Sequence, residues 1–488
     1  MSSYIFDVET DGFLDVVSKV HCIVLKDVDT NTMIHLPVKE AVAKLEKADL
    51  IIGHNIIKYD IPVLQKLYGF DFKNKILDTI VATRLLFPDV KEKDFQRKDF
   101  PRDCIGRHSL KAWGNRIGNY KAQFETDWKT YSPEMLDYCT QDVEVTYNLW
   151  KMIEQKGYSQ QAMDLEHEVS LLIFKQESYG FSFDTDGAKQ LYSKLQSRRL
   201  ELEDELQNLF PPKTLKTPFI PKVNNKARGY VKGETFYKEK IVTFNPSSRH
   251  HIADRLSEMH GWKPTVFNDD GKPKLDETTL SALPYPEAKT LCEHFLLDKR
   301  IGQPATGAQA WLKHEKKNKI HGTCNTNSTV TARATHSYPN MAQIPSVSVQ
   351  YGKECRALFT VPAGKKLVGI DVSGLEVRML AHYMARYDKG DYSKVVLDGD
   401  IHTETQTLAG LDSRDLAKRY FYCFLYGGGV KKIASVINKS VPEASKIKKR
   451  FLNNLPALNK LIVDVQKVAE RGFLMGLDKR QVKVRSSH

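Results

Sequence analysis

The sequence predicts an α/β (α+β) protein of at least two parts, and three features support this fold class. Short apolar runs at 4–6, 50–52 and 367–370 have the length and composition of buried strands. Stretches with apolar residues at helical spacing follow these runs. A charge-laced stretch from 184 to 210 carries leucines at helical spacing, which is typical of one long helix. At 488 residues the chain has room for roughly two to four domains.

Composition and charge narrow the class of protein. Hydrophobic residues make up 41% of the chain, and no run approaches the ~18 apolar residues of a membrane span. The formal net charge of +13 favours a polyanionic partner such as nucleic acid. The seven cysteines are scattered without a CxxC pair, so we expect reduced thiols in a cytosolic compartment. A strand begins directly after Met1-Ser2-Ser3, so we expect no signal peptide.

Four acidic side chains and one tyrosine lie in three separated segments of the N-terminal part. Asp7 and Glu9 are two apart in the first predicted strand, so they share one face of it. Asp60 lies on a predicted helix that follows a strand, and Tyr138 and Asp142 are four apart on one helical face. Carboxylates gathered in one place repel one another unless a cation lies between them. The pattern therefore predicts a two-metal nuclease, with the tyrosine orienting the nucleophile.

Two polar residues near these segments have simpler interpretations. Asp78 opens a predicted helix, so we expect it to cap that helix beneath the cleft and not to bind metal. His54 either contacts substrate or caps its own loop, and the sequence does not choose between these roles.

The middle of the chain is organised around two predicted helices and a basic segment. A connecting helix is expected over 160–178, broken at Gly180, and a longer helix from Asp184 toward Phe210. Residues 211–240 then carry four prolines and eight basic against two acidic side chains, a local charge of +6. Proline and charge predict an exposed, loosely ordered loop. The loop either holds duplex DNA through its phosphates or is simply solvated.

Residues 367–382 have the pattern of a strand, a carboxylate and a helix. The apolar run 367–370 is expected to be a buried strand that ends on Asp371. A carboxylate that leaves a buried strand just before a helix is well placed to hold a metal ion against a phosphate. The alternative is an ordinary cap at the end of a strand, and the spacing alone does not decide between the two.

Residues 414–426 predict a helix with one functional face. Arg414, Lys418, Tyr422 and Tyr426 recur every four residues, so their side chains line one stripe. Two cations and two aromatic rings suit a triphosphate and a stacked base. The alternative is a helix whose rings are buried and whose cations are solvated.

The segments IDVSGLEVRMLAH (370–382) and RDLAKRYFYCFLYG (414–427) resemble motifs A and B of the family A DNA polymerases, most closely those of short-tailed lytic phages. The resemblance implies a right-hand polymerase domain that adds dNTPs to a primer on template DNA. It implies that Asp371 binds two Mg²⁺ ions and that Glu376 excludes the ribose 2′-hydroxyl group.

The resemblance also implies roles around the nucleotide. Arg414, Lys418 and His402, the last in the segment GDIHT, would neutralise the triphosphate, with Lys418 taking part in catalysis. Tyr422 would lie at the sugar and Tyr426 near the templating base. His402 has a simpler alternative, since a single histidine before a helix can serve only as a cap.

The N-terminal part resembles the proofreading 3′–5′ exonuclease superfamily, which implies a ribonuclease-H-like domain over 1–157. The superfamily uses four acidic ligands and a tyrosine. The implied ligands of two further Mg²⁺ ions are Asp7, Glu9, Asp60 and Asp142, and Tyr138 is the implied catalytic tyrosine.

Further residues match segments that hold primer–template DNA in this family. Ser247 and Ser248 resemble the thumb-tip motif and would meet phosphate, and Arg300 would lie near the duplex. Arg333 and Gln343 are the expected minor-groove contacts. Ala332 stands where relatives usually have glycine. Some phage relatives carry an insertion that binds host thioredoxin; the matching segment here is much shorter, so thioredoxin binding is not expected.

One motif of the family is missing from the sequence. The second palm carboxylate comes from a His-Asp-Glu hairpin, and no such tripeptide occurs in the 488 residues. The last residues are a predicted strand over 481–484 followed by a serine N-cap signature. We therefore expect a partial right-hand domain and a C-terminal polymerase fragment as partner. The expected domains are the exonuclease 1–157, a connector 158–183, the thumb 184–320 with its basic loop, and a partial palm and fingers 321–488.

The expected function is phage DNA replication with proofreading in the cytoplasm of the infected host cell. A free-standing 3′–5′ exonuclease, or a DNA-binding remnant without polymerase activity, is the alternative. The intact Asp371, Glu376, Lys418 and Tyr422 favour the polymerase.

Overall fold

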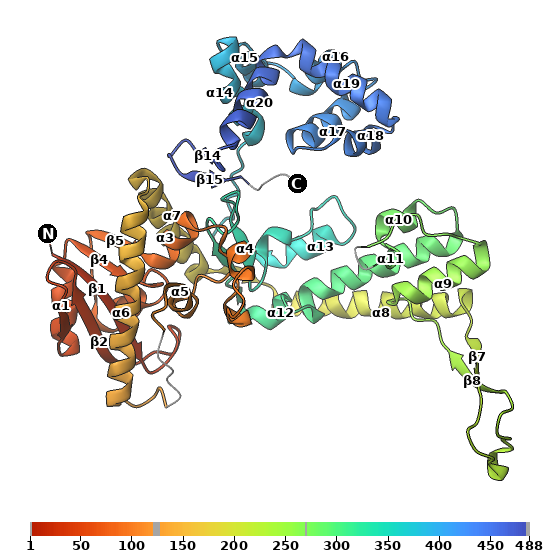
Figure 1. Cartoon of the computed structure of the whole chain (residues 1–488), viewed down its shortest axis with the longest axis horizontal. Helices are drawn as coiled ribbons and strands as arrows, with labels where there is room; N and C mark the ends of the chain where they lie inside the picture. Colours follow the sequence, from red (N-terminus) through yellow and green to blue (C-terminus); the bar gives the residue numbers. More distant parts are fainter. Residues whose placement is uncertain (1, 121–126, 269–270, 485–488) are drawn as a thin grey trace. The chain divides into compact units, whose positions relative to one another are not determined.

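A computed structural model describes residues 2–120, 127–268 and 271–484 (Figure 1). The chain forms two compact units, each built from separate stretches of sequence. The first unit comprises residues 1–172, 326–334 and 368–488, and the second comprises 173–325 and 335–367. The domain boundaries expected from the sequence stay predictions.

The N-terminal part of the first unit is a five-stranded sheet in the order β3-β2-β1-β4-β5. Strand β1 is antiparallel to β2 and parallel to β4, and β4 is parallel to β5. The strands are β1 (Ser3–Thr10), β2 (Val20–Asp27), β3 (Met33–His35), β4 (Leu50–Gly53) and β5 (Lys75–Asp78).

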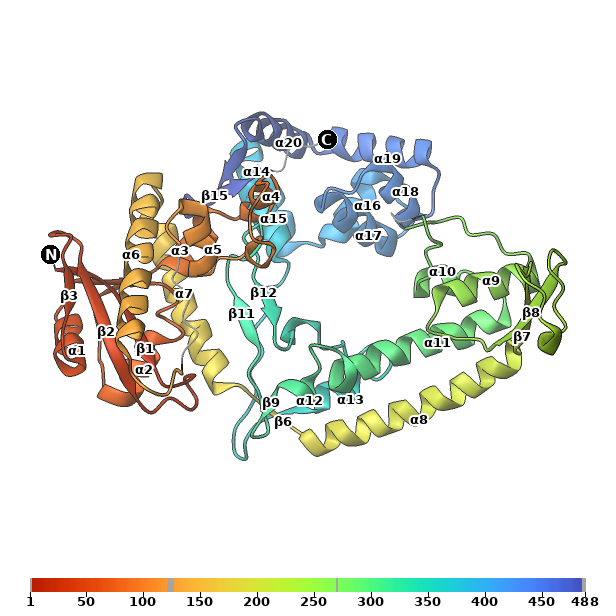
Figure 2. The same ribbon diagram turned by 60° about the horizontal axis from the view of Figure 1, so that its bottom comes forward.

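Helices cover both faces of this sheet. Successive side chains of β1 point to opposite faces, so β1 contributes apolar side chains to the packing on each face. Ile5 packs with Trp113 and Cys139, which belong to α5 (Leu110–Ile117) and α6 (Pro133–Lys156). Phe6 packs on the other side with Leu45 of α1 (Val38–Glu46). Asp7 and Glu9 therefore share the face of Ile5. Helix α6 packs on β1 (Figure 2). The remaining helices here are α2 (Asp60–Tyr68), α3 (Thr79–Leu86), α4 (Val90–Phe95) and α7 (Gln160–Tyr179).

The C-terminal part of the first unit is helical and has its own core. Tyr420, Phe421 and Phe451 are fully buried in it. Its helices are α14 (Leu375–Asp388), α15 (Asp391–Asp398), α16 (Ile401–Ala409), α17 (Arg414–Leu425), α18 (Val430–Ile437), α19 (Val441–Asn454) and α20 (Pro456–Ala469). A hairpin of β14 (Phe473–Met475) and β15 (Gln481–Lys483) follows. Residues 485–488, where the serine N-cap was expected, lie outside the described residues.

The buried strand expected at 367–370 is wrong. These residues form no strand, and Ile370 is 92% exposed. An isolated strand leaves its backbone N–H and C=O groups unpaired, so an apolar run becomes a strand only against a neighbouring strand. Among the described residues, none pairs with this segment.

The second unit is built on two long helices, α8 (Thr185–Leu209) and α11 (Pro286–Ile301), which pack along each other. The predicted helix from Asp184 is confirmed, since the Asp184 carboxylate caps α8 by accepting from the Gly187 N–H at 2.9 Å. A four-stranded sheet has the order β13-β6-β10-β9. Its strands are β6 (Phe181–Phe183), β9 (Glu315–Lys316), β10 (Lys319–Ile320) and β13 (Phe359–Thr360). The other elements are α9 (Arg249–His260), α10 (Glu277–Ser281), α12 (Trp311–His314), α13 (Gly352–Ala357), β11 (Thr323–Asn325) and β12 (Thr335–Ser337).

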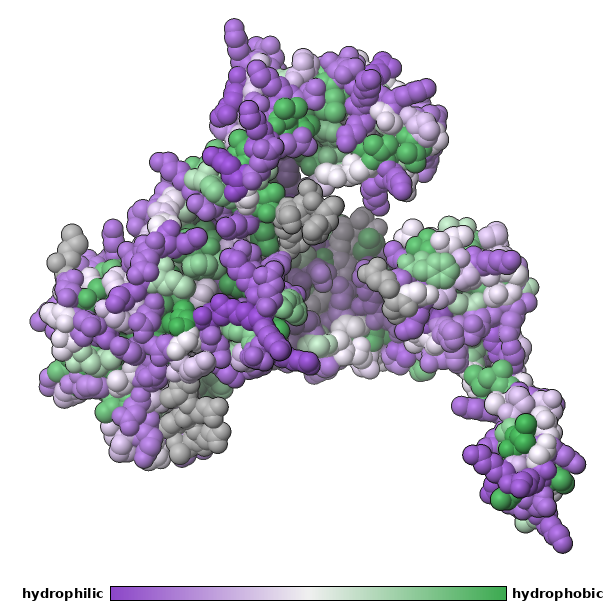
Figure 3. All heavy atoms as spheres, in the orientation of Figure 1, coloured by the Kyte–Doolittle hydropathy of each residue, from purple (hydrophilic) through white to green (hydrophobic). Residues whose placement is uncertain are grey.

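The loosely ordered loop expected at 211–240 is also wrong, because this segment is a β-hairpin. β7 (Lys213–Phe219) pairs in register with β8 (Phe236–Val242). The rings of Phe219, Tyr230 and Phe236 cluster near its far end, with centroids 4.9–6.2 Å apart. The surface of the hairpin mixes hydrophilic side chains with exposed apolar ones such as Val223 and Ile241 (Figure 3).

All seven cysteines are free thiols. In the described stretches, no helix has both the length and the apolar composition needed to cross a bilayer.

Candidate active sites

The first candidate site lies on β1, where two carboxylates meet a thiol. Asp7 and Glu9 project from the same face of the strand, and their oxygens lie within 4.8 Å of one another and of the Cys139 Sγ. The Cys139 thiol, on α6, donates to the Asp7 carbonyl at 3.5 Å and faces Asp7 Oδ2 at 3.9 Å. Burial raises the pKa of Cys139 well above its usual value, so the group stays a neutral thiol. The packing of α6 on β1 thus fixes the floor of the site.

Asp60 belongs to the same neighbourhood. It is the first residue of α2 and is only 4% exposed. Burial, together with the nearby negative charge of Asp7, raises the pKa of Asp60 well above that of an ordinary aspartate. Crowded acidic groups of this kind are stabilised in ionised form by a cation.

Tyr138 and Asp142 lie one turn apart on α6, as the sequence predicts. The Ser132 side chain caps this helix by accepting from the Met135 N–H. Asp142 is 2% exposed, and it lies three residues beyond Cys139, so it shares the helix side that faces β1. The Tyr138 ring meets the Trp128 ring edge-on, with centroids 5.8 Å apart. The four acidic residues and Tyr138 therefore come from elements that surround the first strand.

Two neighbouring side chains make hydrogen bonds beside this cluster. Asp78 caps α3 by accepting from the Ile80 N–H at 3.0 Å, which confirms the expected cap. The His54 Nδ1 lies 2.8 Å from the Thr79 hydroxyl oxygen.

The second candidate site lies on α17 and its neighbours. Arg414 begins this helix and forms a forked ion pair with Asp400, with Nε–Oδ2 and Nη2–Oδ1 distances of 2.6 and 3.1 Å. The Arg414 hydrogen bonds lower the pKa of Asp400 far below its usual value. Lys418, one turn later, is exposed. Two cations thus lie on one stripe of the helix.

Aromatic side chains continue this stripe. The His402 and Tyr422 ring centroids are 5.8 Å apart, and those of Tyr422 and Tyr426 are 6.4 Å apart in a stacked arrangement. Burial and the nearby Arg414 cation lower the pKa of His402, so this imidazole is neutral near pH 7. Neutral His402 therefore offers a hydrogen bond and not a charge.

Tyr426 connects this stripe to α14. Its hydroxyl donates to Glu376 Oε1 at 3.1 Å, which raises the pKa of Tyr426 above its usual value. The Arg333 side chain lies beside the same hydroxyl and acts in the opposite direction. The structure thus brings Glu376, Tyr426 and Arg333 together.

Asp371 does not join either cluster. It is exposed and lies in a segment without secondary structure, just before α14. Within the described ranges, no group of three potential metal ligands includes Asp371. Its role as a metal ligand stays a prediction.

The expected DNA contacts in the second unit differ in exposure. Ser248 caps α9 by accepting from the His251 N–H, and the Ser247 hydroxyl donates to Asp298 Oδ2 at 3.4 Å. Arg300 is only 5% exposed, and its Nε donates to the Gln350 carbonyl at 3.1 Å. Gln343 is exposed, and its carbonyl accepts from the Gln303 side chain at 3.0 Å. DNA contact by these residues stays a prediction.

Ala332 occupies a strained backbone conformation. Its φ of 61° lies in the left-handed region, which glycine enters freely and alanine does not. The position therefore demands glycine-like geometry, although its side chain is a methyl group.

Sequence reasoning missed three residues at these sites. Cys139 and Trp128 touch Asp7 and Tyr138 only because α6 packs on the sheet and the chain before it folds back. Asp400 pairs with Arg414 across a gap of 14 residues. No sequence signal pointed to Asp400, because the Arg414 stripe was interpreted either as a triphosphate site or as solvated cations.

Comparisons with known proteins show that the chain is similar to DNA polymerases. Residues 224–486 match the family model described as DNA polymerase family A. The chain is 35% identical to the DNA-directed DNA polymerase of Escherichia phage T7, over 99% of this chain and 86% of that protein, and equally similar to that of Enterobacteria phage T3. It is 24% identical to DNA polymerase I of Helicobacter pylori, over 87% of this chain and 43% of that protein.

A solved structure shares the fold. It is the POL domain of Pol1 from M. smegmatis in complex with DNA primer-template and dNTP, with a TM-score of 0.69 and 15% identity. The alignment covers 100% of this chain and 79% of that one. The α/β (α+β) class predicted from the sequence is confirmed.

Proposed function

The chain belongs to DNA polymerase family A and is a DNA-directed DNA polymerase, and from this premise we propose that it carries two separate sites that act on DNA. One site, on α17 and α14, binds the incoming dNTP. The other, on β1 and α6, removes nucleotides from a 3′ end. We place both activities in phage replication, in the cytoplasm of the infected host cell.

The exonuclease proposal rests on the cluster of Asp7 and Glu9 with Asp60 beside it. Carboxylate oxygens are the ligands that Mg²⁺ prefers. Burial, with the nearby charge of Asp7 as a second cause, raises the pKa of Asp60, and a bound cation would stabilise its ionised form. The residues present therefore fit a divalent metal site. We propose that Asp7, Glu9, Asp60 and Asp142 hold two Mg²⁺ ions. Cys139 is a soft thiol ligand, which does not suit Mg²⁺, so it lines the site without binding the metal.

The chemistry follows from this arrangement. When bound, the metal ions supply an activated water and stabilise the departing oxygen of the phosphodiester. Tyr138 orients the attacking water through its hydroxyl, and the edge-on contact with Trp128 limits the rotation of its ring. Cleavage releases one deoxynucleoside monophosphate from the 3′ end and leaves a new 3′-hydroxyl on the shortened strand.

An end-labelled oligonucleotide tests this proposal. Asp142→Asn should abolish stepwise shortening from the 3′ end, with Mg²⁺ present and dNTPs absent. Asp137→Asn is the matched control, because Asp137 is exposed on the same helix and outside the cluster. Equal shortening by both variants, or shortening from the 5′ end, would contradict the proposal.

The nucleotide site is proposed from the stripe on α17. Arg414 offers a forked pair of donors and Lys418 a point charge, which together suit the oxygens of a triphosphate. Tyr422 would contact the sugar and Tyr426 the templating base. Glu376, held by Tyr426 at 3.1 Å, would occupy the space that a ribose 2′-hydroxyl needs.

Equilibrium binding of a dNTP tests this stripe without any catalysis. Arg414→Ala and Lys418→Ala should each weaken binding at least tenfold. Arg419→Ala is the matched control, because it removes a cation from the same helix away from the stripe. Equal affinities for all three variants would refute the proposed site.

One expected ligand of the polymerase metal site, Asp371, lies among the described residues. Family members depend on divalent metals, and two ions need a second carboxylate besides Asp371. The described residues around Asp371 do not fit a two-ion site, so we route no step through it. We propose that a second polypeptide bearing a palm carboxylate can complete this site and pair with the apolar segment 367–370.

Complementation tests this partner. A polypeptide recovered with the chain from infected cells should restore primer extension and slow hydrogen exchange of the backbone amides of 367–370. Restored synthesis without slower exchange would contradict pairing at this segment.

For primer–template DNA, we propose contacts from Ser247, Ser248, Arg300, Arg333 and Gln343.

A further inference from the structure

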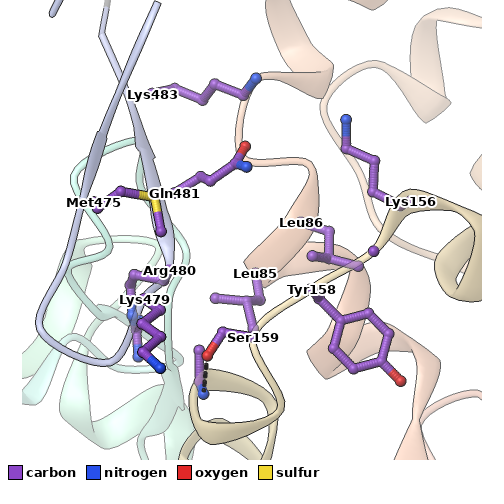
Figure 4. Close-up of a pocket in the computed structure, with 12 residues that line it drawn as sticks. Leu85, Leu86, Lys156, Tyr158, Ser159, Met475, Lys479, Arg480, Gln481 and Lys483 are labelled. Atoms are coloured by element: carbon purple, nitrogen blue, oxygen red, sulfur yellow. Dashed lines mark hydrogen bonds between the residues drawn. The ribbon is translucent and has the colours of Figure 1, made fainter. Parts of the chain in front are cut away.

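A cationic pocket lies between two parts of the first unit that are distant in sequence. Its cavity of about 330 Å³ is lined by the end of α3, the α6–α7 loop and the β14–β15 hairpin. Gln481 and Lys483 extend from the hairpin toward the side of the pocket on which Leu86 and Lys156 lie (Figure 4). The pocket therefore joins the proposed exonuclease part to the hairpin that follows the polymerase helices.

Hydrogen bonds and ion pairs hold the two sides of this pocket together. The Ser159 hydroxyl donates to the Asp478 carbonyl at 2.6 Å. Arg480, in the hairpin, forms ion pairs with Glu166 of α7 at 2.7 Å and with Asp478 at 2.6 Å. These three charged side chains are 9–14% exposed, so they form a nearly buried link. Specific polar contacts therefore hold the two sides of the pocket in place.

The charges of the lining are not balanced. Glu166 and Asp478 offset Arg480, but Lys156, Lys479 and Lys483 make no ion pair within the part of the chain that the structure describes. Four cations against two carboxylates leave a charge of +2. Cations gathered around a hollow favour an anion within it.

Resting on the proposed exonuclease function, we propose that this pocket binds a phosphate of single-stranded DNA, and so holds a strand that has left the duplex. Its volume is near the lower end of the range for small-ligand pockets, which suits one nucleotide unit. A frayed primer must cross from the polymerase part to the exonuclease part, and this pocket is lined by both. Backbone recognition by lysine needs no particular base, as such a transfer requires.

Equilibrium binding of a fluorescent single-stranded oligonucleotide in EDTA tests the proposal without either catalytic activity. The test variant is Lys156→Gln/Lys479→Gln/Lys483→Gln. The matched control is Lys39→Gln/Lys47→Gln/Lys75→Gln, which removes three exposed lysines from α1, its end and β5. Equal thermal transitions for the two variants would show that both are folded.

The salt dependence gives the decisive number. Each phosphate contact on a single strand contributes about 0.7 to the slope of log affinity against log salt, so losing the one phosphate held in the pocket should lower that slope by about 0.7. Between 50 and 200 mM salt, the parent affinity should then fall roughly 2.6-fold more than that of the test variant. The control should keep the parent slope.

Two results would overturn the proposal. The first is an identical salt slope for the test variant and the parent. The second is binding of inorganic phosphate that the test variant loses while its oligonucleotide slope is unchanged, since this would assign the pocket to free phosphate. Because the assay needs no cleavage, loss of exonuclease activity elsewhere would not affect its outcome.

Discussion

Asp78 is expected to hold together two backbone segments beneath the proposed exonuclease site, the loop with Asn55 and Ile57 and the start of α3. Its carboxylate accepts from the N–H groups of Asn55, Ile57 and Ile80 at 2.8, 3.1 and 3.0 Å. The side chain is 1% exposed, so water cannot replace it easily. Asp78→Ala would therefore leave three buried donors without an acceptor.

The size of the effect follows from these contacts. A hydrogen bond to a charged group contributes about 1.5–3 kcal/mol, and neighbouring losses are not additive because the loop relaxes. We expect Asp78→Ala to lower the free energy of local opening by about 3–5 kcal/mol. Asp78→Asn keeps one acceptor oxygen and removes a buried charge, so its cost should be smaller.

Hydrogen–deuterium exchange of the full-length chain measures this opening locally. Peptides that cover 53–60 and 79–86 should exchange about 100- to 5,000-fold faster in Asp78→Ala, since about 1.4 kcal/mol corresponds to a factor of ten. Asp71→Ala is the control, because the Asp71 side chain is 68% exposed. Exchange within threefold of the parent in Asp78→Ala would refute the reasoning.

Two further predictions concern charge. Burial, reinforced by the Arg84 cation, lowers the pKa of His108 to about 3. The unfolded chain therefore takes up this proton first, and stability is lost as pH falls below about 6.5. Urea unfolding measures the decrease in the free energy of unfolding between pH 7 and pH 5. This decrease should be about 1–2 kcal/mol smaller in His108→Gln than in the parent, and an equal decrease would contradict the prediction. Arg414 must give up its ion pair with Asp400 before it can bind a triphosphate, so Asp400→Asn should tighten dNTP binding several-fold. Weaker dNTP binding by this variant would show instead that Asp400 positions Arg414.

Helices with clear ends were predictable from the sequence. Asp184 is a capping residue followed by leucines at helical spacing, and α8 begins one residue later. The spacing of Arg414, Lys418 and Tyr422 likewise predicted α17. These features depend on local geometry, which the sequence encodes directly.

Features that depend on distant partners were not predictable in the same way. The run 367–370 is as apolar as a buried strand, but a strand also needs a neighbour to pair with. In the hairpin of β7 and β8, prolines and lysines favour a loop, whereas the pairing of Phe219 with Phe236 depends on the partner strand. The Cys139–Asp7 contact depends on how α6 packs on β1. Tertiary packing decided each of these cases.

Primer extension by the purified chain alone tests the central claim, that residues 1–488 hold a complete exonuclease site and an incomplete polymerase site. A labelled primer–template is incubated with Mg²⁺ and all four dNTPs. The unmutated chain should shorten the primer, and an Asp7→Ala/Glu9→Ala variant should neither shorten nor extend it. Robust extension by that variant would contradict the account, because a second metal-binding carboxylate would then lie within the chain.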